Sequence, residues 1–208
     1  NVAEQTEHFV NSGGLKFDWF TSDYKHRIGV HASTQHVHRD SYYGTHQDPN
    51  AYGTTNDLTI VGGIQYVYSM AKCWFLPAEL TVGAEVNYNS LHDETISHRH
   101  DLQQEVFTYS AFAQNEWKNS QWTFLLGLRM DKHSMIKMPI FSPRVNLRYN
   151  PAEWVSLLTG YAMGFRAPQI FDEDLHITAV GGKSSFVSNA SNLKPETSHS
   201  VNLSADFY

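Results

Sequence analysis

Two pairs of histidines have the spacing in this sequence that best suits contact with a metal centre. His36 and His38 form one pair, and His98 and His100 form the other, each with a single residue between its members. Alternate residues of an extended chain point to the same side, so the two rings of a pair would share one face. Neutral imidazole is a common ligand of iron and other transition metals. The pairs are therefore candidate metal contacts, although 12 histidines on a polar surface need no metal to explain them.

A third candidate site is an acidic segment in which Asp172, Glu173 and Asp174 precede His176. Carboxylate oxygens are the ligands that Ca²⁺ prefers, but this ion takes about six to eight of them. The segment has too few nearby oxygens to support a calcium site. A solvated acidic loop with a bystander histidine explains the same residues, and we expect no intrinsic cofactor.

No arrangement of residues in the sequence indicates catalysis. The Gly-x-Ser-x-Gly elbow, the His-Glu-x-x-His helix and the phosphate-binding glycine loop are all missing. An enzyme is therefore not expected. A membrane-barrel hydrolase with a histidine and a serine or aspartate at its rim is the alternative that this pattern leaves open.

Charge and hydropathy exclude two classes of protein. The formal net charge is −6, and the 15 Lys and Arg residues form no cluster along the chain. Binding to nucleic-acid phosphates takes a clustered basic surface, so nucleic acid is not an expected partner. No apolar run reaches the roughly 18 residues that a membrane-spanning helix needs. The single cysteine, Cys73, cannot form an internal disulfide.

The elements that must position these side chains are predicted by alternation of apolar and polar residues. Alternation with a period of two is typical of a β-strand whose two faces meet different surroundings. The clearest example is 78–90, where apolar residues occupy the even positions from Ala78 to Tyr88. The same pattern predicts strands at 58–70, 121–132 and 140–150, and a weaker version predicts strands at 14–22, 25–38, 103–117, 154–165 and 199–208.

These predicted strands, about nine in all, are longer than the 5–6 residues common in soluble proteins. At about 3.3 Å per residue and a tilt near 45°, twelve to fourteen residues rise roughly 28–33 Å, enough to cross a hydrocarbon core of about 30 Å. Short links are expected near 22–23, 71–77, 118–121 and 150–153, and they alternate with long links at 39–56, 91–102, 132–138 and 166–197. This alternation is typical of the short periplasmic turns and long extracellular loops of membrane barrels.

Aromatic residues flank the predicted short turns, as an interfacial girdle would require. They are Tyr68 and Trp74, Trp117 and Trp122, and Tyr149 and Trp154. The charged side chains of Arg129, Asp131, Arg144 and Arg148 would then face the lumen, where water and opposite charges can satisfy them. The sequence thus predicts an all-β protein, a segment of an antiparallel transmembrane β-barrel. A soluble β-sandwich binding module, and a complete barrel of about eight to ten strands acting as an adhesin or anchor, are the alternatives.

Residues 105–208 also carry a set of motifs, in order and at matching spacing, that resembles the barrel of TonB-dependent receptors. The motifs are Ser110 to Trp117, Trp122 to Phe124, Gly127 to Asp131, Phe141 to Tyr149, Gly164 to Pro168 and Asn192 to Ser198. The resemblance implies an outer-membrane barrel of about 22 strands, of which residues 1–208 would be one part, without the plug domain. It also implies uptake of a metal-bearing nutrient, driven by a TonB complex acting on that plug.

The resemblance further implies partners and a substrate. Lipid and lipopolysaccharide would surround the barrel, and a surface lipoprotein is a further possible partner. In haem receptors of this kind, a histidine lies between a Phe-Arg-Ala-Pro motif and an Asn-Pro-Asn-Leu-like motif, and His176 occupies that interval here, although the second motif lacks its proline. Haem or a cobalamin-like corrinoid is therefore the first expected ligand and a ferric siderophore the second. The expected contacts are Phe165, Arg166, Asp172, Glu173, Asp174 and His176.

Overall fold

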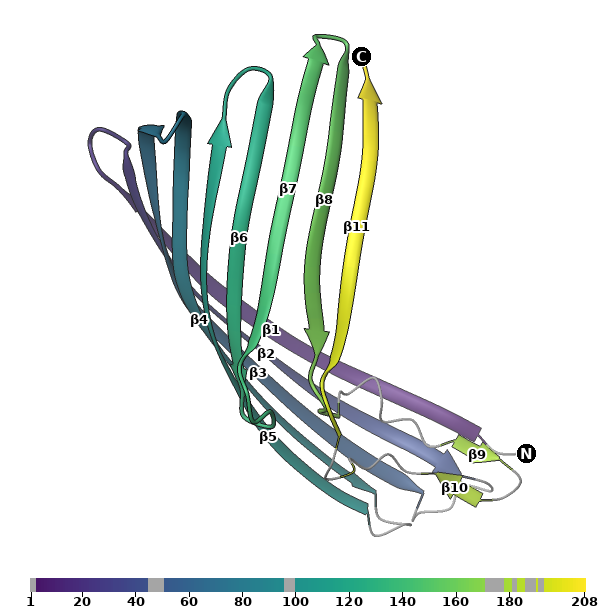
Figure 1. Ribbon diagram of the computed structural model, residues 1–208. Helices are drawn as coiled ribbons and strands as arrows, with labels where there is room; N and C mark the ends of the chain where they lie inside the picture. The colour runs from purple at the N-terminus through teal and green to yellow at the C-terminus, as the bar shows by residue number, and fades with distance from the viewer. Residues whose placement is uncertain are drawn as a thin grey trace.

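The computed structural model describes residues 3–44, 51–95, 100–170, 178–180, 183–185, 190 and 193–208. One antiparallel sheet of nine strands dominates it, in the order β1-β2-β3-β4-β5-β6-β7-β8-β11, with a separate two-stranded sheet of β9 and β10 (Figure 1). The strands are β1 (Ala3–Phe20), β2 (His26–Gly44), β3 (Tyr52–Cys73), β4 (Leu76–Thr95), β5 (His100–Lys118), β6 (Trp122–His133), β7 (Ile140–Ala152), β8 (Val155–Arg166), β9 (Thr178–Val180), β10 (Lys183–Ser185) and β11 (Glu196–Phe207). Within these ranges, no helix is long and apolar enough to cross a membrane.

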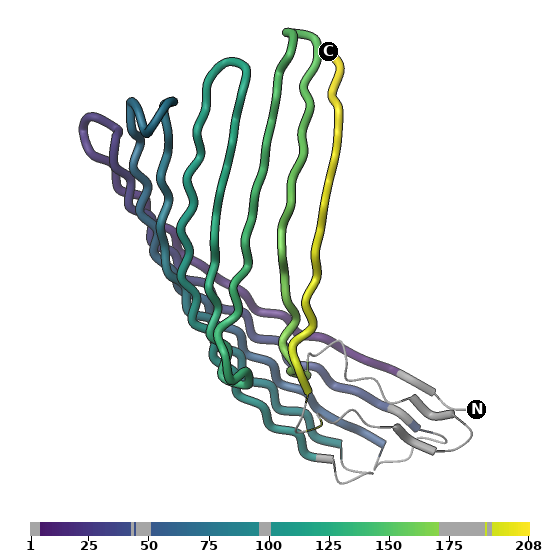
Figure 2. The backbone as a smooth tube through the Cα atoms, in the orientation of Figure 1, coloured from purple at the N-terminus to yellow at the C-terminus, as the bar shows by residue number. Residues whose placement is uncertain are grey.

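The nine main strands form a curved wall in which each strand lies beside the next in the chain (Figures 1 and 2). The short connections and the end of β11 lie together at the upper end of the wall in Figure 1, and the strand ends that the long connections join lie at the other end. Polar side chains close the short turns. Asp23 accepts hydrogen bonds from the Thr21 hydroxyl at 2.6 Å and the Lys25 amide at 3.1 Å, and these two bonds lower the pKa of its carboxyl. The predicted alternation of short and long links holds except at 91–102, where β4 and β5 leave only residues 96–99 between them, fewer than the 21–25 of the first short link.

Several strands are longer than the sequence pattern predicts. The expected link at 71–77 shrinks to Trp74 and Phe75, and the expected long link at 39–56 lies partly within β2 and β3. β1 begins at Ala3, which pairs with Gly44, and not near residue 14. Beyond a membrane both faces of a strand are wet, so side chains need not alternate there while the backbone ladder continues. The five strands β1 to β5 thus project past the length that a bilayer crossing needs.

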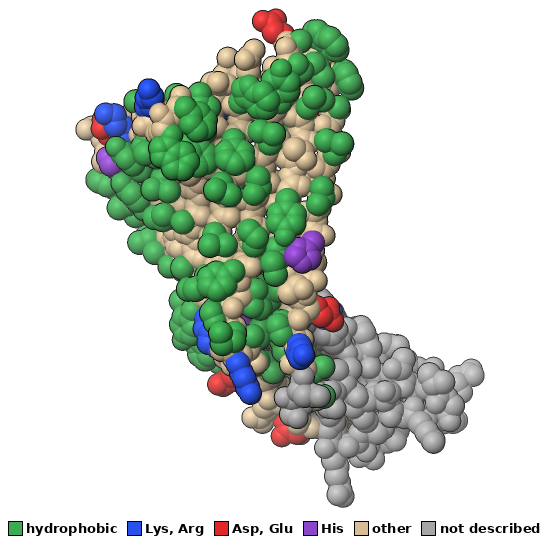
Figure 3. Space-filling model, in the orientation of Figure 1, with side chains coloured by type: hydrophobic (Ala, Val, Ile, Leu, Met, Phe, Trp, Pro, Cys, Tyr) green, Lys and Arg blue, Asp and Glu red, His purple; other side chains and the backbone are tan. Residues whose placement is uncertain are grey.

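One face of the sheet is apolar across strand after strand. A single register row joins Phe17, Val30, Ile64, Ala84, Ala111, Met130 and Phe141 on seven successive strands. These side chains are uncovered, and Figure 3 shows hydrophobic side chains gathered over the face that it presents. A soluble sandwich would bury this face under a second sheet, but the second sheet among the described residues has two strands of three residues each. The sandwich alternative is therefore wrong, and the apolar face is the one that meets lipid.

Aromatic rings gather at the short-turn end of this apolar face. Trp117 is 5% exposed, and its ring lies 5.6 Å from the rings of both Trp74 and Phe124. Trp122 stacks on Tyr149 with their ring centres 4.0 Å apart. Tryptophan and tyrosine favour the headgroup level, where a ring can be buried while its polar atom stays near water. The predicted clustering of aromatic residues at the short turns is confirmed, and it is the arrangement expected where these turns lie at one membrane surface.

The two outer strands of the sheet each have one free edge. β1 pairs with β2 and β11 pairs with β8, and no pairing joins β1 to β11 among the described residues. The nine strands therefore form an open wall and not the closed small barrel considered from the sequence.

We expect residues 1–208 on their own to depend on detergent, because the apolar face and both strand edges would otherwise meet water. In detergent micelles, sedimentation velocity should report one species, and removal of detergent should produce aggregates. A monodisperse monomer without detergent would contradict the assignment of the apolar face to lipid.

An arginine placed on the apolar face should destabilise the wall far more than one placed opposite. Ala84→Arg puts a charge among Ile64 and Ala111 on the lipid side and should cost about 2–4 kcal/mol. Asn87→Arg, on the other face of the same strand, is the matched control and should cost about 1 kcal/mol or less. Equilibrium unfolding in phospholipid vesicles measures both, and equal costs would show that the two faces are misassigned.

Candidate functional site

The face opposite the lipid side carries a network of charged side chains centred on Glu85 of β4. Arg129 Nη2 lies 3.0 Å from Glu85 Oε1, and Arg129 Nε lies 2.8 Å from Asp131 Oδ1. Ser110 accepts a hydrogen bond from Arg129 at 2.7 Å and donates one to Asp131 at 2.6 Å. Asp131 is 3% exposed, so burial without these partners would be costly. The predicted lumen pairing of Arg129 and Asp131 is confirmed.

Glycines let side chains of this network reach across neighbouring strands. His31 on β2 places its Nε2 atom 3.8 Å from Glu85 Oε2 on β4, and Gly63 of β3 lies between them. A Cβ atom on Gly63 would stand 2.5 Å from the His31 ring, so any other residue would displace that ring. Glu85 consequently links β2, β4 and β6, and its charge is already balanced by Arg129.

A second network lies on the same face towards the long-loop end. The Arg39 guanidinium donates to the Thr55 hydroxyl at 2.8 Å, and that hydroxyl donates to Asp93 at 2.5 Å. Arg39 is 4% exposed and Thr55 is 1% exposed. Arg39 and Asp93 also lie 3.6 Å apart as an ion pair. These side chains stabilise the extended parts of β2 to β4 and offer no unbalanced charge to a ligand.

β7 differs, because its two lumen-facing arginines are held by neutral groups. Arg148 donates to the Ser156 hydroxyl at 2.8 Å and to Asn150 at 3.1 Å. Arg144 lies 3.1 Å from the Asn146 side chain, with that amide turned to accept. Neither guanidinium has a carboxylate within 4.0 Å in the described part of the chain. Both arginines line a hollow of about 250 Å³ that Glu116 of β5 also lines, so two guanidinium groups face one carboxylate there and the hollow suits an anion.

After β8 the chain turns onto the lumen face and is tied to β5 and β6. We call Ala167 to Ile170 the strap. The Gln104 side chain donates to the Ile170 carbonyl at 2.8 Å and accepts from the Ile170 amide at 3.0 Å. The Gln169 side chain meets His133 Nε2 at 2.8 Å. Ile170 is 2% exposed and packs with Leu91 and Leu102. The strap therefore fixes the direction in which the long loop leaves the wall.

The residues expected from the sequence to bind substrate fall into two groups. Phe165 and Arg166 end β8, with Phe165 on the lipid side and Arg166 on the lumen side. The others, Asp172, Glu173, Asp174 and His176, lie outside the described residues. Their role in binding stays a prediction, and the strap shows only where the segment that carries them begins.

The first histidine pair lies on the face away from the lumen. His36 and His38 share a face, but it is the face of Val30 and Ile64, opposite the lumen. His38 Nδ1 lies 2.9 Å from Asn56 Oδ1, and its Nε2 lies 3.4 Å from Asp40. His98 lies outside the described residues, and His100 is the first residue of β5. No group of three or more metal-binding side chains occurs among the residues that were placed.

Sequence reasoning missed the strap and the glycine-spaced network. Gln104 and Ile170 are 66 positions apart, and no local pattern links them. The one available signal was Ile170 itself, an apolar residue soon after Pro168 in a loop expected to be polar.

The two-faced sheet, the aromatic girdle and the asymmetric connections together define the wall of an outer-membrane β-barrel. The model of the TonB dependent receptor-like beta-barrel family matches residues 4–208, and the chain belongs to that family. Its members are receptors of the outer membrane of Gram-negative bacteria, which places this chain there and gives no indication of an enzyme. No curated protein matches the sequence.

Solved structures with a similar fold carry the names of iron receptors. The siderophore receptor PirA from Acinetobacter baumannii is 18% identical with a TM-score of 0.78, over 98% of this chain and 33% of that one. The ferric enterobactin receptor PfeA from Pseudomonas aeruginosa, as its G324V mutant, is 18% identical with a TM-score of 0.73, over 98% and 33%. The ferric-catecholate import receptor Fiu from E. coli K12 is 10% identical with a TM-score of 0.69, over 97% and 38%. The chain thus spans about a third of the length of these receptors.

Removing the Gln104 side chain should loosen the strap while leaving the wall intact. Gln104→Ala leaves the buried N–H and C=O of Ile170 without partners, at about 1–3 kcal/mol each. The Ile170 amide should then exchange with solvent hydrogen about tenfold faster or more. Gln103→Ala, one residue away on the opposite face, is the control and should leave that rate unchanged. An unchanged rate in Gln104→Ala would show that the strap is held by other contacts.

Proposed function

We propose that this chain forms part of the wall of a receptor that takes up a ferric siderophore across the outer membrane. A TonB complex, acting on a plug domain that these residues do not include, would drive the uptake. Membership of the receptor family supports this proposal, as do the names of the similar structures, which include a siderophore receptor, a ferric enterobactin receptor and a ferric citrate transporter.

The observation that carries the choice of ligand is the unbalanced positive charge on β7. Arg144 and Arg148 face the lumen and share a hollow with the single carboxylate of Glu116, and their hydrogen-bond partners are neutral amides and hydroxyls. Ferric iron is a hard cation that binds negatively charged oxygen donors, so its complexes with such chelators are commonly anionic. A lumen wall that presents guanidinium groups attracts an anion and raises its local concentration. Arginine also suits planar carboxylate groups, which it can bind through two parallel hydrogen bonds.

The preference for haem or a corrinoid that the sequence suggested is not supported by the comparisons, because the named relatives are ferric siderophore receptors. Its one remaining basis is His176, whose position relative to the Phe-Arg-Ala-Pro motif resembles that of an iron ligand. We therefore rank the siderophore first and treat haem as the second candidate.

Partners follow from the same proposal. Lipid, with lipopolysaccharide in the outer leaflet, would cover the apolar face, and the plug would fill the lumen and contact TonB. A surface lipoprotein that delivers the ligand is a further partner that the family resemblance suggests.

Ligand titration of the full-length receptor tests the function. Ferric citrate and ferric enterobactin serve as anionic probes, beside haem and cobalamin. We expect an anionic ferric chelate to bind, and the double variant Arg144→Gln, Arg148→Gln to lower its affinity about tenfold or more, equivalent to about 1.4 kcal/mol. The loss should shrink at high salt, because added ions screen the attraction that the variant lacks.

Two variants separate the alternatives. Lys132→Gln removes a positive charge from the lipid-side row of the neighbouring strand and should leave the affinity unchanged. His176→Ala should also leave ferric chelate binding unchanged. The siderophore proposal would be wrong, and the haem alternative right, if two results occurred together. The receptor would bind haem but neither ferric chelate, and His176→Ala would abolish haem binding.

A further inference from the structure

The wall splits between β7 and β8 before either strand ends. The two strands pair as far as Arg144 and Ala162, and no further partners join them towards the long-loop end. β7 nevertheless stays paired with β6 up to Ile140, and β8 stays paired with β11 up to Arg166. The first residue of β7 past the last pair is Pro143, which has no N–H to donate to a ladder. We call the unpaired boundary between 140–143 of β7 and 163–166 of β8 the seam. Along it β7 stays paired with β6, and β8 stays paired with β11.

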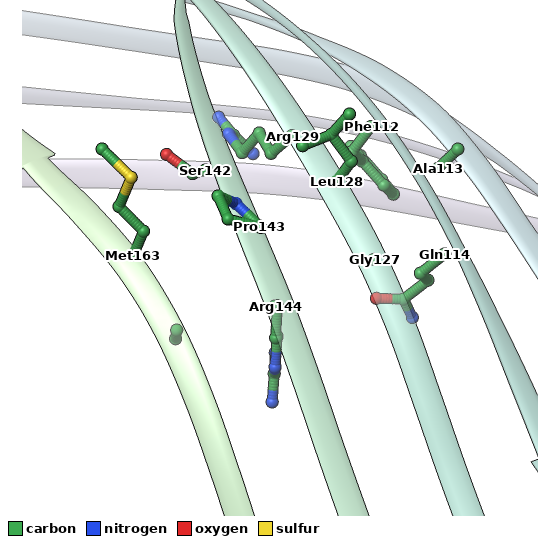
Figure 4. Close-up of a pocket in the computed structure, with 11 residues that line it drawn as sticks. Phe112, Ala113, Gln114, Gly127, Leu128, Arg129, Ser142, Pro143, Arg144 and Met163 are labelled. Carbon is green, nitrogen blue, oxygen red and sulfur yellow. The ribbon is translucent and has the colours of Figure 1, made fainter. Parts of the chain in front are cut away.

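The strap explains why the end of β8 leaves its neighbour. Gln169 and Ile170 are bound to β6 and β5, so the chain leaving β8 must cross the inner side of β7 and β6 to reach them. The seam is closed at its base by the Arg144 and Ala162 pair and crossed by the strap at the other end. Figure 4 shows β8, with Met163, diverging from β7, with Ser142, Pro143 and Arg144.

The seam contains a hollow of about 290 Å³ that is lined from both faces of the wall. Its lipid-side lining is apolar and comprises Ala113, Leu128, Pro143 and Met163. Its lumen-side lining is mixed: the polar side chains of Gln114, Arg129, Ser142 and Arg144 stand beside the apolar Phe112 and Ala162. The hollow is therefore bordered by side chains of both faces of the sheet. We call it the seam notch.

We propose that the seam notch binds the acyl chain of an anionic amphiphile whose head lies on the lumen side beside Arg144. This inference rests on the proposed function and narrows its substrate class to ferric chelators that bear a fatty acyl chain. The notch lies just below the roughly 300–1,000 Å³ of pockets that enclose whole small molecules, so it suits a chain better than a chelate. Leu128, Pro143 and Met163 provide the apolar contacts that a hydrocarbon chain requires.

Arg144 connects the two halves of such a ligand. It lines the seam notch and also the lumen hollow that it shares with Arg148, so a head held in that hollow lies next to the entrance of the notch. Its guanidinium is bonded to an amide and not to a carboxylate, and it can therefore accept an anionic head without first losing an ion pair. Arg129, which also lines the notch, is already paired with Glu85 and Asp131.

Fatty acids of increasing length test the proposal in the full-length receptor, held in nanodiscs of zwitterionic phospholipid. Hexanoate, octanoate and decanoate share one head, and the contribution of the notch is the affinity of each in the unmodified receptor relative to Met163→Trp in the same nanodiscs, because partition into the phospholipid also rises with chain length. Each added methylene that enters the notch should raise affinity by up to about fourfold, the equivalent of about 0.8 kcal/mol. Decanol, which lacks the charge, should bind more weakly than decanoate in the unmodified receptor. Calorimetry measures the affinities.

Three variants define the expected results. Met163→Trp fills the notch and should lower decanoate affinity at least tenfold, to near that of hexanoate. Arg144→Gln should weaken all three fatty acids and leave decanol unchanged. Leu203→Trp enlarges a lipid-side residue on β11 away from the notch, and its decanoate affinity should match that of the unmodified receptor.

Equal decanoate affinity in Met163→Trp and Leu203→Trp would overturn the proposal. Native mass spectra could also overturn it. If the receptor retains a bilayer lipid that Met163→Trp loses and that decanoate does not displace, the occupant of the notch is a membrane lipid. Failure of the notch is distinguishable from failure of the proposed function. Ferric citrate or ferric enterobactin binding with no chain-length effect rejects the notch alone, whereas a chain-length effect together with haem binding that is lost in His176→Ala rejects the siderophore function alone.

Discussion

Inside a bilayer every peptide N–H and C=O must find its partner within the protein, because hydrocarbon offers none. A sheet meets this requirement where its strands pair side by side, and the nine main strands here pair in chain order. Alternate side chains of a paired strand point to opposite faces, so one face meets lipid and the other meets the lumen. The apolar row from Phe17 to Phe141 and the charged network around Glu85 both follow from this constraint.

The lumen face divides into a part that stabilises the wall and a part that can receive a ligand. Glu85 joins side chains from β2 and β6, and Arg39 joins β2 to β3 and β4, so the charges of Glu85, Arg129, Asp131, Arg39 and Asp93 balance one another. On β7 the arginines rest on amides and hydroxyls. A guanidinium held in this way keeps its full charge available, which is why the β7 side of the lumen is the one that we associate with an anionic ligand.

The architecture becomes individual beyond the last pair of β7 and β8. β1 to β5 continue as a paired sheet, whereas β8 parts from β7 and the following strap binds the inner face of β5 and β6. The Ile170 amide and carbonyl of the strap, which lie outside the ladder, find their partners in the Gln104 side chain. The strap, the seam and the start of the long loop are thus one connected feature.

The amino-acid sequence by itself determined the nine strands of the wall, their faces, the positions of the short turns and the aromatic girdle, because each is a local consequence of alternation and turn chemistry. It underestimated β1 to β5, since strands that are wet on both sides show no alternation. Only the tertiary structure decided that Arg129 meets Glu85, 44 positions away, that Gln104 holds Ile170, and that β7 and β8 separate. Those contacts depend on the register between strands, and a shift of one residue would turn every side chain to the other face.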